Sequence, residues 1–571
     1  MKQFRSLIYP FTAVLLLGLA ACSRSKFASL NTNPDAVLSI APEYELTTGQ
    51  MPVYNNSYEA FYDFYQYIRP WTQLWVSAAG NTGGIGAFTS VANGNDRWNN
   101  FYSNVGPPLV DVQHLISIAP AATKAKYVYL NAITGINLVE YAFYVSDPNG
   151  SMPYSAALQA RYTGNLTPVW DAQQALFDTL DAQLKSYVAI LETPQTVAQD
   201  TAGANDIVFQ GNVTKWIKAA NSLRLRIAMR LIKQNPSQLT TIANQVLADP
   251  VGLIDNTSDE WVFTGGANFE GSGGNSNYNP LGFSGNQCME KNVVDFMNRT
   301  KDPRVRALLQ PAAISTQDMF DSAQIQGQIP AGETWDGQIY RGQYANPDEG
   351  KVAAKSYYFR TLNFSYQGIK QSINYPSIIQ PYILYAPYNS GNGLNVFPVI
   401  TYADVCFMRA ELVLNALSND GASAQTLYNA GVAASLQDFD AWAQLAQTPS
   451  YTPLGATEVT TYLAQPGVAY QASTAEEQIL DQEYLNMYMN PNEAWALIKR
   501  TGYPSPTGVI MPLETLTSGG SPVVMPRRYV PNFPLLGDLN YNNAASAINT
   551  ELQQPGFGLA NDITGKVWWD Q

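Results

Sequence analysis

The sequence predicts a mostly α-helical globular protein with two loop-rich regions. Three observations lead to this fold class. Apolar residues recur at helical spacing along many stretches, small residues such as Ala132, Gly135 and Ala220 recur inside them, and short polar turns join neighbouring stretches. Because closely packed antiparallel helices need small residues at their contacts, the pattern indicates helix pairs stacked in the manner of an α-solenoid. With 571 residues, of which 46% are hydrophobic, the chain can bury a large core.

The charge content excludes some classes of function. Only 13% of the residues are charged and the net charge is −13, so the chain repels phosphate backbones and broad nucleic-acid binding is not expected. The single histidine, His114, lies in a stretch with the pattern of an ordinary helix. We therefore expect His114 to be structural, without a Ser-His-Asp triad or a histidine-rich metal centre.

The first element in the chain is an export signal. Lys2 and Arg5 precede an apolar segment at 8–21, which is too short for a comfortable membrane span. The segment ends in Leu-Ala-Ala-Cys, which resembles the lipobox of bacterial lipoproteins. The resemblance implies cleavage of residues 1–21 and acylation of Cys22. A plain secretory signal that leaves a free thiol is the alternative.

A polar segment follows the cysteine. Residues 22–40 contain the run Asn-Thr-Asn-Pro and are expected to form a lipidated tether. No later stretch reaches about 18 uncharged apolar residues, so no further membrane span is expected. Residues 41–571 are expected to form a single domain.

The clearest helical face lies before Asn235-Pro236, which is a helix stop. Its apolar members follow one another by four, three, four and four positions: Trp216, Ala220, Leu223, Ile227 and Leu231. Six cations and no acid accompany this face, among them Lys215, Lys218, Arg226, Arg230 and Lys233. They can form an anion site or pair with neighbouring carboxylates, and the acidic character of the chain favours pairing.

Other stretches with helical periodicity follow the same pattern. They lie at 97–118, 122–145, 168–191, 237–248, 402–417, 422–445 and 474–500. Two regions differ: residues 265–285 hold seven glycines, and residues 310–399 are rich in Pro, Gly, Tyr and Asn. We expect long loops with short strands there, and long loops on a rigid scaffold often carry binding sites.

The remaining cysteines do not predict a metal site. Cys406 lies in an apolar run and is expected to be buried. Whether it pairs with Cys288 stays open, because two cysteines alone do not fix a disulfide. No zinc or haem spacing occurs, so we expect no metal and no cofactor.

Several short motifs run in order along the chain. They are Met152-Pro153-Tyr154-Ser155-Ala156-Ala157, Trp216 to Arg226, Asp302-Pro303-Arg304, Tyr402 to Glu411, Trp495 to Pro504, Pro526-Arg527-Arg528 and Asn540-Tyr541-Asn542. Taken together, these motifs resemble the SusD/RagB family of outer-membrane lipoproteins. Asp404 and Lys499 replace the usual Glu and Arg of two of the motifs, and an expected Glu is missing after Pro531.

The resemblance carries expectations about fold and function. It implies tetratricopeptide-like helix pairs as a scaffold, with an irregular loop-rich half packed over it. It implies a lipoprotein of the outer membrane, facing the cell exterior, that captures nutrient oligomers. The implied partner is a SusC-like TonB-dependent transporter, over which the protein sits as a lid. The tether contains no acidic residue, so the outward orientation rests on the family alone.

A glycan site needs exposed aromatic faces beside amides, since sugar rings present flat C–H faces edged by hydroxyls. Three places combine these groups, and each side chain can equally belong to the core. The residues that we predict to bind ligand are Trp75, Trp98, Trp261, Tyr278, Trp335 and Tyr340.

Three other functions compete with glycan capture. A member of the same family could capture peptides instead, and a stack of helix pairs could act as a pure interaction scaffold. A surface glycoside hydrolase would need two carboxylates about 5–9.5 Å apart, and no pair among the 45 acids stands out. Since the sequence also has no phosphate loop and no nucleophile elbow, we expect a binding protein and not an enzyme.

Overall fold

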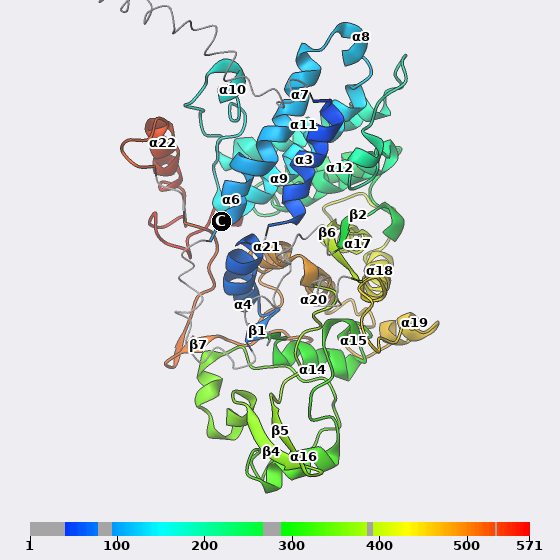
Figure 1. Cartoon of the computed structure of the whole chain (residues 1–571), viewed down its shortest axis with the longest axis vertical. Helices are drawn as coiled ribbons and strands as arrows, with labels where there is room; N and C mark the ends of the chain where they lie inside the picture. The colour runs from blue at the N-terminus through cyan, green and yellow to red at the C-terminus, as the bar shows by residue number, and fades with distance from the viewer. Residues whose placement is uncertain (1–39, 57, 78–93, 267–286, 385–391, 531–533) are drawn as a thin grey trace, which may run out of the picture.

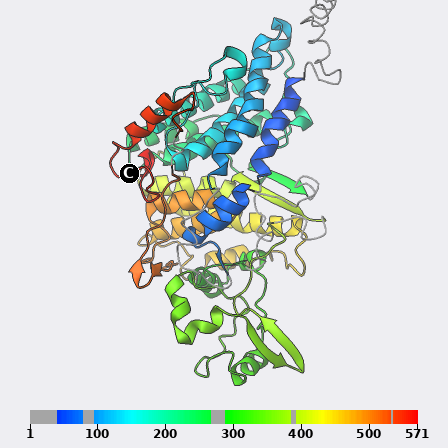
Figure 2. The same cartoon turned by 60° about the vertical axis from the view of Figure 1, so that its left-hand side comes forward.

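Three tiers of helices and loops make up the chain along its longest axis (Figures 1 and 2). The computed structural model describes residues 40–56, 58–77, 94–266, 287–384, 392–530 and 534–571. Long helices in blue to green form the upper tier of Figure 1, yellow and orange helices the middle tier, and a green loop-rich lobe the lower tier. The predicted mostly helical fold is confirmed.

The upper tier consists of helices that follow one another in the chain and pack side by side. α9 contacts α11, α11 contacts α12, and α12 contacts α13. The predicted helices at 122–145 and 168–191 begin later than expected, because Tyr127 and Ala172 are the non-helical residues before α9 and α11. The elements are α3 (Pro42–Tyr54), α7 (Gly106–Ile118), α8 (Ala121–Lys124), α9 (Val128–Asn149), α10 (Ala160–Thr163), α11 (Gln173–Glu192), the 3-10 segment η3 (Gly203–Asn205), α12 (Val213–Met229) and α13 (Pro236–Leu247).

Helix α12 confirms the clearest helical face in the sequence. Asn212 caps its first turn by accepting from the backbone N–H of Lys215, and Trp216 is fully buried. Four of the six cations pair with carboxylates, as the acidic composition favoured: Lys218 with Asp255 and Asp259, Arg224 with Asp181, Arg226 with Asp404, and Arg230 with Asp147 and Glu493. Lys215 and Lys233 donate to backbone carbonyls instead. Arg226 and Arg230 join the upper tier to the middle tier.

One predicted helix of the middle tier is two helices in the structure. The expected helix at 474–500 breaks at Asn490, whose φ of −129° and ψ of 75° are not helical, and Pro491 starts a new helix at its first position. The elements around this tier are η1 (Glu59–Ile68), α4 (Arg69–Thr72), α6 (Asp96–Asn100), η2 (Phe101–Val105), α17 (Tyr402–Leu414), α18 (Ala424–Leu445), α19 (Glu458–Leu463), α20 (Ala475–Asn486), η8 (Met487–Met489) and α21 (Pro491–Thr501).

The lower lobe is the loop-rich region expected from residues 310–399. A β-hairpin of β4 and β5 pairs Leu362 with Ile373, and it packs with α16 over a small core of its own. Its elements and those around it are α14 (Lys291–Thr300), α15 (Val305–Leu308), α16 (Gln317–Ile325), η5 (Pro347–Lys351), η6 (Ala353–Tyr358), β4 (Leu362–Tyr366) and β5 (Ile369–Ile373).

Short antiparallel strand pairs and the C-terminal segment complete the fold. β1 pairs with β3, β2 with β6, and β7 with β8. The bounds are β1 (Val76–Ser77), η4 (Thr257–Asp259), β2 (Trp261–Gly266), β3 (Gln287–Cys288), β6 (Leu394–Ile400), β7 (Thr517–Ser518), β8 (Ser521–Pro522), α22 (Tyr541–Glu551) and η9 (Trp568–Asp570).

Three further expectations can be compared with the structure. The ring of His114 stacks on Tyr162 with 3.9 Å between the ring centroids, as a structural residue would. Cys288 and Cys406 are both buried, and they do not form a disulfide with each other. Within the part of the chain that the structure describes, no helix is long and apolar enough to cross a membrane, and no group of His, Cys, Asp and Glu could hold a metal ion.

Candidate ligand-binding site

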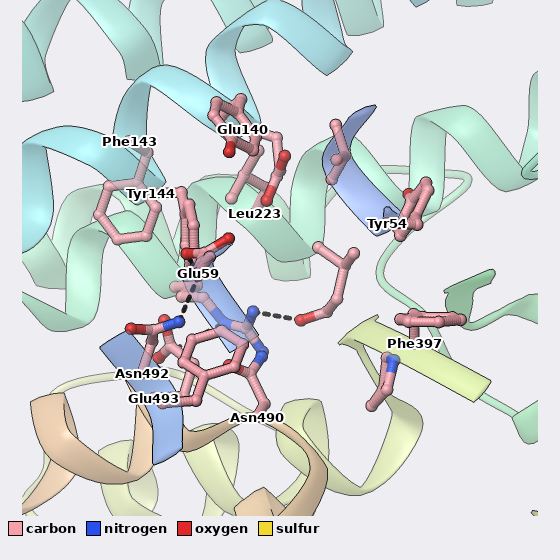
Figure 3. A pocket seen from close by; sticks show the side chains of 16 residues that line it. Tyr54, Glu59, Glu140, Phe143, Tyr144, Leu223, Phe397, Asn490, Asn492 and Glu493 are labelled. Carbon is pink, nitrogen blue, oxygen red and sulfur yellow. Dashed lines mark hydrogen bonds and ion pairs between the residues drawn. The ribbon is translucent and has the colours of Figure 1, made fainter. Parts of the chain in front are cut away.

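The centre of the molecule holds an enclosed pocket between the upper and middle tiers (Figure 3). Its volume is about 70 Å³, which is room for a few water molecules and far too little for a pyranose ring. The carboxylates of Glu59, Glu140 and Glu493 are among the side chains that line it. We therefore treat this pocket as part of the structural framework.

Burial governs the titration of the acids in this pocket. Desolvation raises the pKa of Glu59 to about 7, although Arg97 opposes the shift with its Nε 3.5 Å from the carboxylate. Desolvation also raises the pKa of Glu140 to about 8, against the attraction of Arg226. Both acids therefore hold their protons more tightly than exposed carboxyl groups do.

A buried ion network closes the pocket on the side of the middle tier. Arg226 donates to Asp404 at 2.8 Å, and Arg230 donates to Glu493 at 2.9 Å and to Asp147 at 2.8 Å. All five side chains are at most 11% exposed, so water screens these charges weakly. The network joins helices from distant parts of the chain and has no room for a ligand.

A groove on the surface fits a sugar better. We call it the Trp98 groove: it has a volume of about 400 Å³ and lies between the α6–η2 segment, the loop before α11 and the segment before α22. The ring centroids of Trp98 and Trp170 are 5.5 Å apart, and Tyr102 lies 5.3 Å from Trp98. The groove therefore presents partly exposed aromatic rings in a space of the size that small-ligand sites have.

Polar contacts fix the walls of the Trp98 groove. The hydroxyl of Tyr102 donates to the carbonyl of Pro153 at 2.6 Å. The amide of Asn540 donates to the carbonyl of Pro168 at 2.9 Å, which ties the segment before α22 to the loop before α11. Asp538 is exposed on the same rim. An aromatic wall with amide and carboxylate groups beside it can stack on a sugar ring and bond its hydroxyls.

Two of the six predicted site residues are buried. Trp75 is 2% exposed, and the guanidinium of Arg69 lies 3.4 Å from its ring centroid. Trp261 is 1% exposed, packs edge-on against Trp216 and donates to the hydroxyl of Tyr54 at 3.1 Å. Neither ring presents a face to solvent in this structure.

Three of the other four are described by the structure, and they lie in different parts of the molecule. Trp98 lines the groove, whereas Trp335 belongs to the lower lobe, where Arg341 lies 4.4 Å from its ring centroid. Tyr340 is partly buried against the core of the middle tier. Tyr278 and the lipidation candidate Cys22 lie outside the described residues. Of the five predicted site residues that the structure describes, Trp98 is the one that lines the Trp98 groove.

Three residues of the Trp98 groove were not predicted from the sequence as site residues: Trp170, Asp538 and Asn540. Trp170 fell inside the predicted helix at 168–191, but α11 begins only at Gln173, so Trp170 lies in the preceding loop. The proline at 168 was the available signal for a loop at this point, since a proline often marks the first turn of a helix or the segment before it. The local sequence gave no sign that Asn540 contacts Pro168, which lies 372 positions earlier in the chain.

Comparisons with known proteins agree with this fold. A family model described as SusD-like, "Starch-binding associating with outer membrane", matches residues 34–531. A search of curated proteins found no match. Solved structures that share the fold include a chitin-binding protein, with 22% sequence identity and a TM-score of 0.69 over 93% of this chain and 99% of that chain.

Two further solved structures show the same architecture. A Bacteroidetes SusD-like protein has 19% identity and a TM-score of 0.67, over 93% of this chain and 100% of that one. A chitin-binding SusD homologue from Flavobacterium johnsoniae has 19% identity and a TM-score of 0.58, over 93% of this chain and 98% of that one. Because the family model matches most of the chain, the chain belongs to the SusD-like family of binding proteins associated with the outer membrane.

Proposed function

We propose that this protein captures oligosaccharides at the Trp98 groove and delivers them to a SusC-like TonB-dependent transporter, for which it acts as a lid. The observation that carries the proposal is the contact between Trp98 and Trp170 in a groove of about 400 Å³ on the surface. Aromatic rings in such a groove can stack on the C–H faces of sugar rings.

The family supports a glycan as the ligand. The matching family model is described as starch-binding, and two of the solved structures with this fold are named chitin-binding. The alternation of apolar and polar groups in the Trp98 groove suits a ligand with apolar ring faces and hydroxyl edges.

The proposed location is the outer face of the outer membrane. The lipobox-like segment before Cys22 supports acylation of that cysteine, and the family description supports the outer membrane. A lipid at the start of the chain followed by a polar tether would keep the protein next to a transporter in the same membrane. Protease treatment of intact cells checks the orientation, because protection of the chain would contradict an exposed lid.

Native mass spectrometry of the mature protein, from Ser23 onward, tests the function. We would incubate it with mixed oligosaccharides and mixed peptides and follow free and bound species over hours. Intact oligosaccharides that stay bound support capture. Bound peptides alone would overturn the ligand class, and oligosaccharides that become shorter with time would indicate a hydrolase.

A pair of matched variants tests the site. We expect Trp98→Leu to weaken oligosaccharide binding roughly tenfold or more, because an aromatic anchor in a groove carries a large share of the binding energy. Trp335→Leu is the control, since it makes the same change in a partly buried ring of the lower lobe. Loss of binding in Trp335→Leu with normal binding in Trp98→Leu would move the site to the lower lobe.

A further inference from the structure

A second surface hollow lies on the other side of the α6–η2 segment. We call it the Tyr58 hollow; it has a volume of about 510 Å³. Its polar lining consists of Asn55, Asn56, Tyr58, Asp96, Asn100 and Asn104. Asp96, Asn100 and Asn104 follow one another at intervals of four residues and so share one side of this segment, whereas Trp98 and Tyr102 line the Trp98 groove on another side.

Two π-helical segments border the Tyr58 hollow. η1 starts directly after Tyr58, and η2 contains Asn104. π-Helical backbone is rare and occurs frequently at functional sites, because it widens the helix at the expense of regular hydrogen bonds. Two such segments beside one hollow therefore favour a functional role for this surface.

An exposed aromatic ring stands at the edge of the hollow. Tyr58 is 60% exposed, although moving a tyrosine ring out of water is energetically favourable. Its ring stacks on Tyr62 with centroids 5.8 Å apart and an angle of 29° between the planes. The contact with Tyr62 fixes the orientation of Tyr58 while one face stays open to a ligand.

Hydrogen bonds hold the amide side chains of the hollow in place. Asn104 donates to the side-chain oxygen of Asn100 at 2.9 Å, and Asn100 donates to the hydroxyl of Tyr141 at 2.7 Å and to the carbonyl of Pro52 at 3.0 Å. Among the residues that the structure describes, no protein group donates to Oδ1 of Asn104 or to the carboxylate of Asp96. These acceptors are therefore available to hydroxyl groups of a ligand.

A buried carboxylate positions Asp96. The backbone N–H groups of Asn95 and Asp96 donate to the two oxygens of Asp63, at 2.5 and 3.0 Å. Asp63 is fully buried, so these bonds fix the start of α6 against η1. The acidic side chain of Asp96 is thereby held at the rim of the hollow.

The Tyr58 hollow and the enclosed pocket of Figure 3 share a stretch of chain in their linings. From this stretch, Glu59 lines the enclosed pocket and Tyr58 lines the hollow. Inside, Tyr144 donates to Glu59, and Asn492 donates to Tyr144 at 2.5 Å. This buried network holds Glu59, the neighbour of Tyr58, in place, as the supporting contacts of a preorganised binding site do.

We propose that the Tyr58 hollow is a second sugar-binding subsite, in which Tyr58 stacks on a pyranose ring while Asp96 and Asn104 accept hydrogen bonds from its hydroxyl groups. This inference rests on the proposed function, since it takes an oligosaccharide as the ligand. The Trp98 groove and the Tyr58 hollow flank one helical segment, so an oligosaccharide of several rings can contact both. Short oligosaccharides can occupy only one of them.

Calorimetric titration of the mature protein with maltooligosaccharides and chitooligosaccharides of increasing length tests the inference. For the series that the wild type binds, we expect the double variant Tyr58→Ala/Asn104→Ala to bind the longest chains roughly tenfold more weakly. Asp96→Asn, which keeps the size of the side chain, should produce a smaller loss in the same direction. Both altered residues of the double variant are exposed, so the fold should be kept.

Tyr44→Ala is the matched control, because Tyr44 is 55% exposed and lies near the start of α3, outside the lining of both sites. If the double variant binds long chains as tightly as the wild type while Trp98→Leu still loses binding, the second subsite is wrong and the proposed function stands. If the wild type binds no oligosaccharide of either series or of the mixture above, the proposed function itself is overturned.

Discussion

Nη2 of Arg230 lies 2.9 Å from each carboxylate oxygen of Glu493, across 263 positions of the chain. Arg230 caps the end of α12 in the upper tier, and Glu493 lies in the first turn of α21 in the middle tier. The same guanidinium reaches Asp147 at the end of α9. One buried cation thus ties three helices from distant parts of the sequence together.

Arg230→Ala should destabilise the protein strongly. It leaves the carboxylates of Asp147 and Glu493 buried without their main partner, and the loss of one member of a buried ion pair typically costs about 3–5 kcal/mol. Urea unfolding measures the free energy of unfolding. The control is Arg161→Ala, since Arg161 pairs with Asp111 at 3.4 Å while its side chain is 75% exposed. That pair should contribute less than about 1 kcal/mol, and equal losses in the two variants would contradict the prediction.

Glu140→Gln should stabilise the protein at alkaline pH. Because burial raises the pKa of Glu140 from an ordinary value of 4.5 to about 8, the folded state holds a proton that the unfolded chain releases. The contribution of Glu140 to the stability of the wild type is therefore complete below about pH 4.5 and falls as the pH rises through the window from about 4.5 to 8. The neutral amide removes this loss, which is on the order of 5 kcal/mol above pH 8.

Glu458→Gln is the control, because the pKa of Glu458 is shifted in the opposite direction to that of Glu140. Arg306 donates to Glu458 and lowers the pKa of that carboxyl to about 2, so the pair stabilises the fold at neutral pH and loses its effect as the pH falls toward 2. Unfolding by urea at a series of pH values should give a flatter pH profile for Glu140→Gln. An unchanged slope between pH 5 and 8 would show that Glu140 titrates normally.

Local sequence patterns predicted the helical scaffold well, because helical periodicity and caps act within a few turns. The apolar face of Trp216 is confirmed on this ground. The pairing of four of the six nearby cations was predicted from the acidic composition of the chain. The break at Asn490 was missed, since the apolar pattern continues across Pro491 and a proline is also compatible with the first turn of a helix.

The ligand site was harder to predict, because exposure depends on partners that are distant in the sequence. Trp75 is covered by Arg69 and Tyr488, and Trp261 by Tyr54 and Trp216, so two aromatic residues beside polar loops are buried. Trp170 joins Trp98 only through the folded contact of two loops. Composition showed that aromatic rings and amides were abundant, but only the fold shows which of them share a surface.

Gly135→Ala tests the role of small residues in the helix pairs. A Cβ atom at Gly135 in α9 would lie 2.2 Å from Cζ of Tyr187 in α11, so the ring must move or the helices must separate. We expect a loss of about 1–3 kcal/mol in urea unfolding, although alanine favours a helix by about 1 kcal/mol over glycine. In a Tyr187→Leu background the same change should be neutral or stabilising. A loss of equal size in both backgrounds would show that the contact between the helices is not the cause.

Oligosaccharide should stabilise the folded state by an amount that the Trp98 groove controls. A ligand that binds only the folded state adds about 2.7 kcal/mol to the free energy of unfolding at about 100 times its Kd. If Trp98→Leu weakens binding about tenfold, the same ligand concentration should add only about 1.4 kcal/mol to that variant. Urea unfolding with and without the oligosaccharide identified by mass spectrometry measures both increments, and Trp335→Leu should keep the increment of the wild type. Because each protein is compared with itself, a change in intrinsic stability cancels. Equal increments in the wild type and in Trp98→Leu would place the bound sugar outside the Trp98 groove.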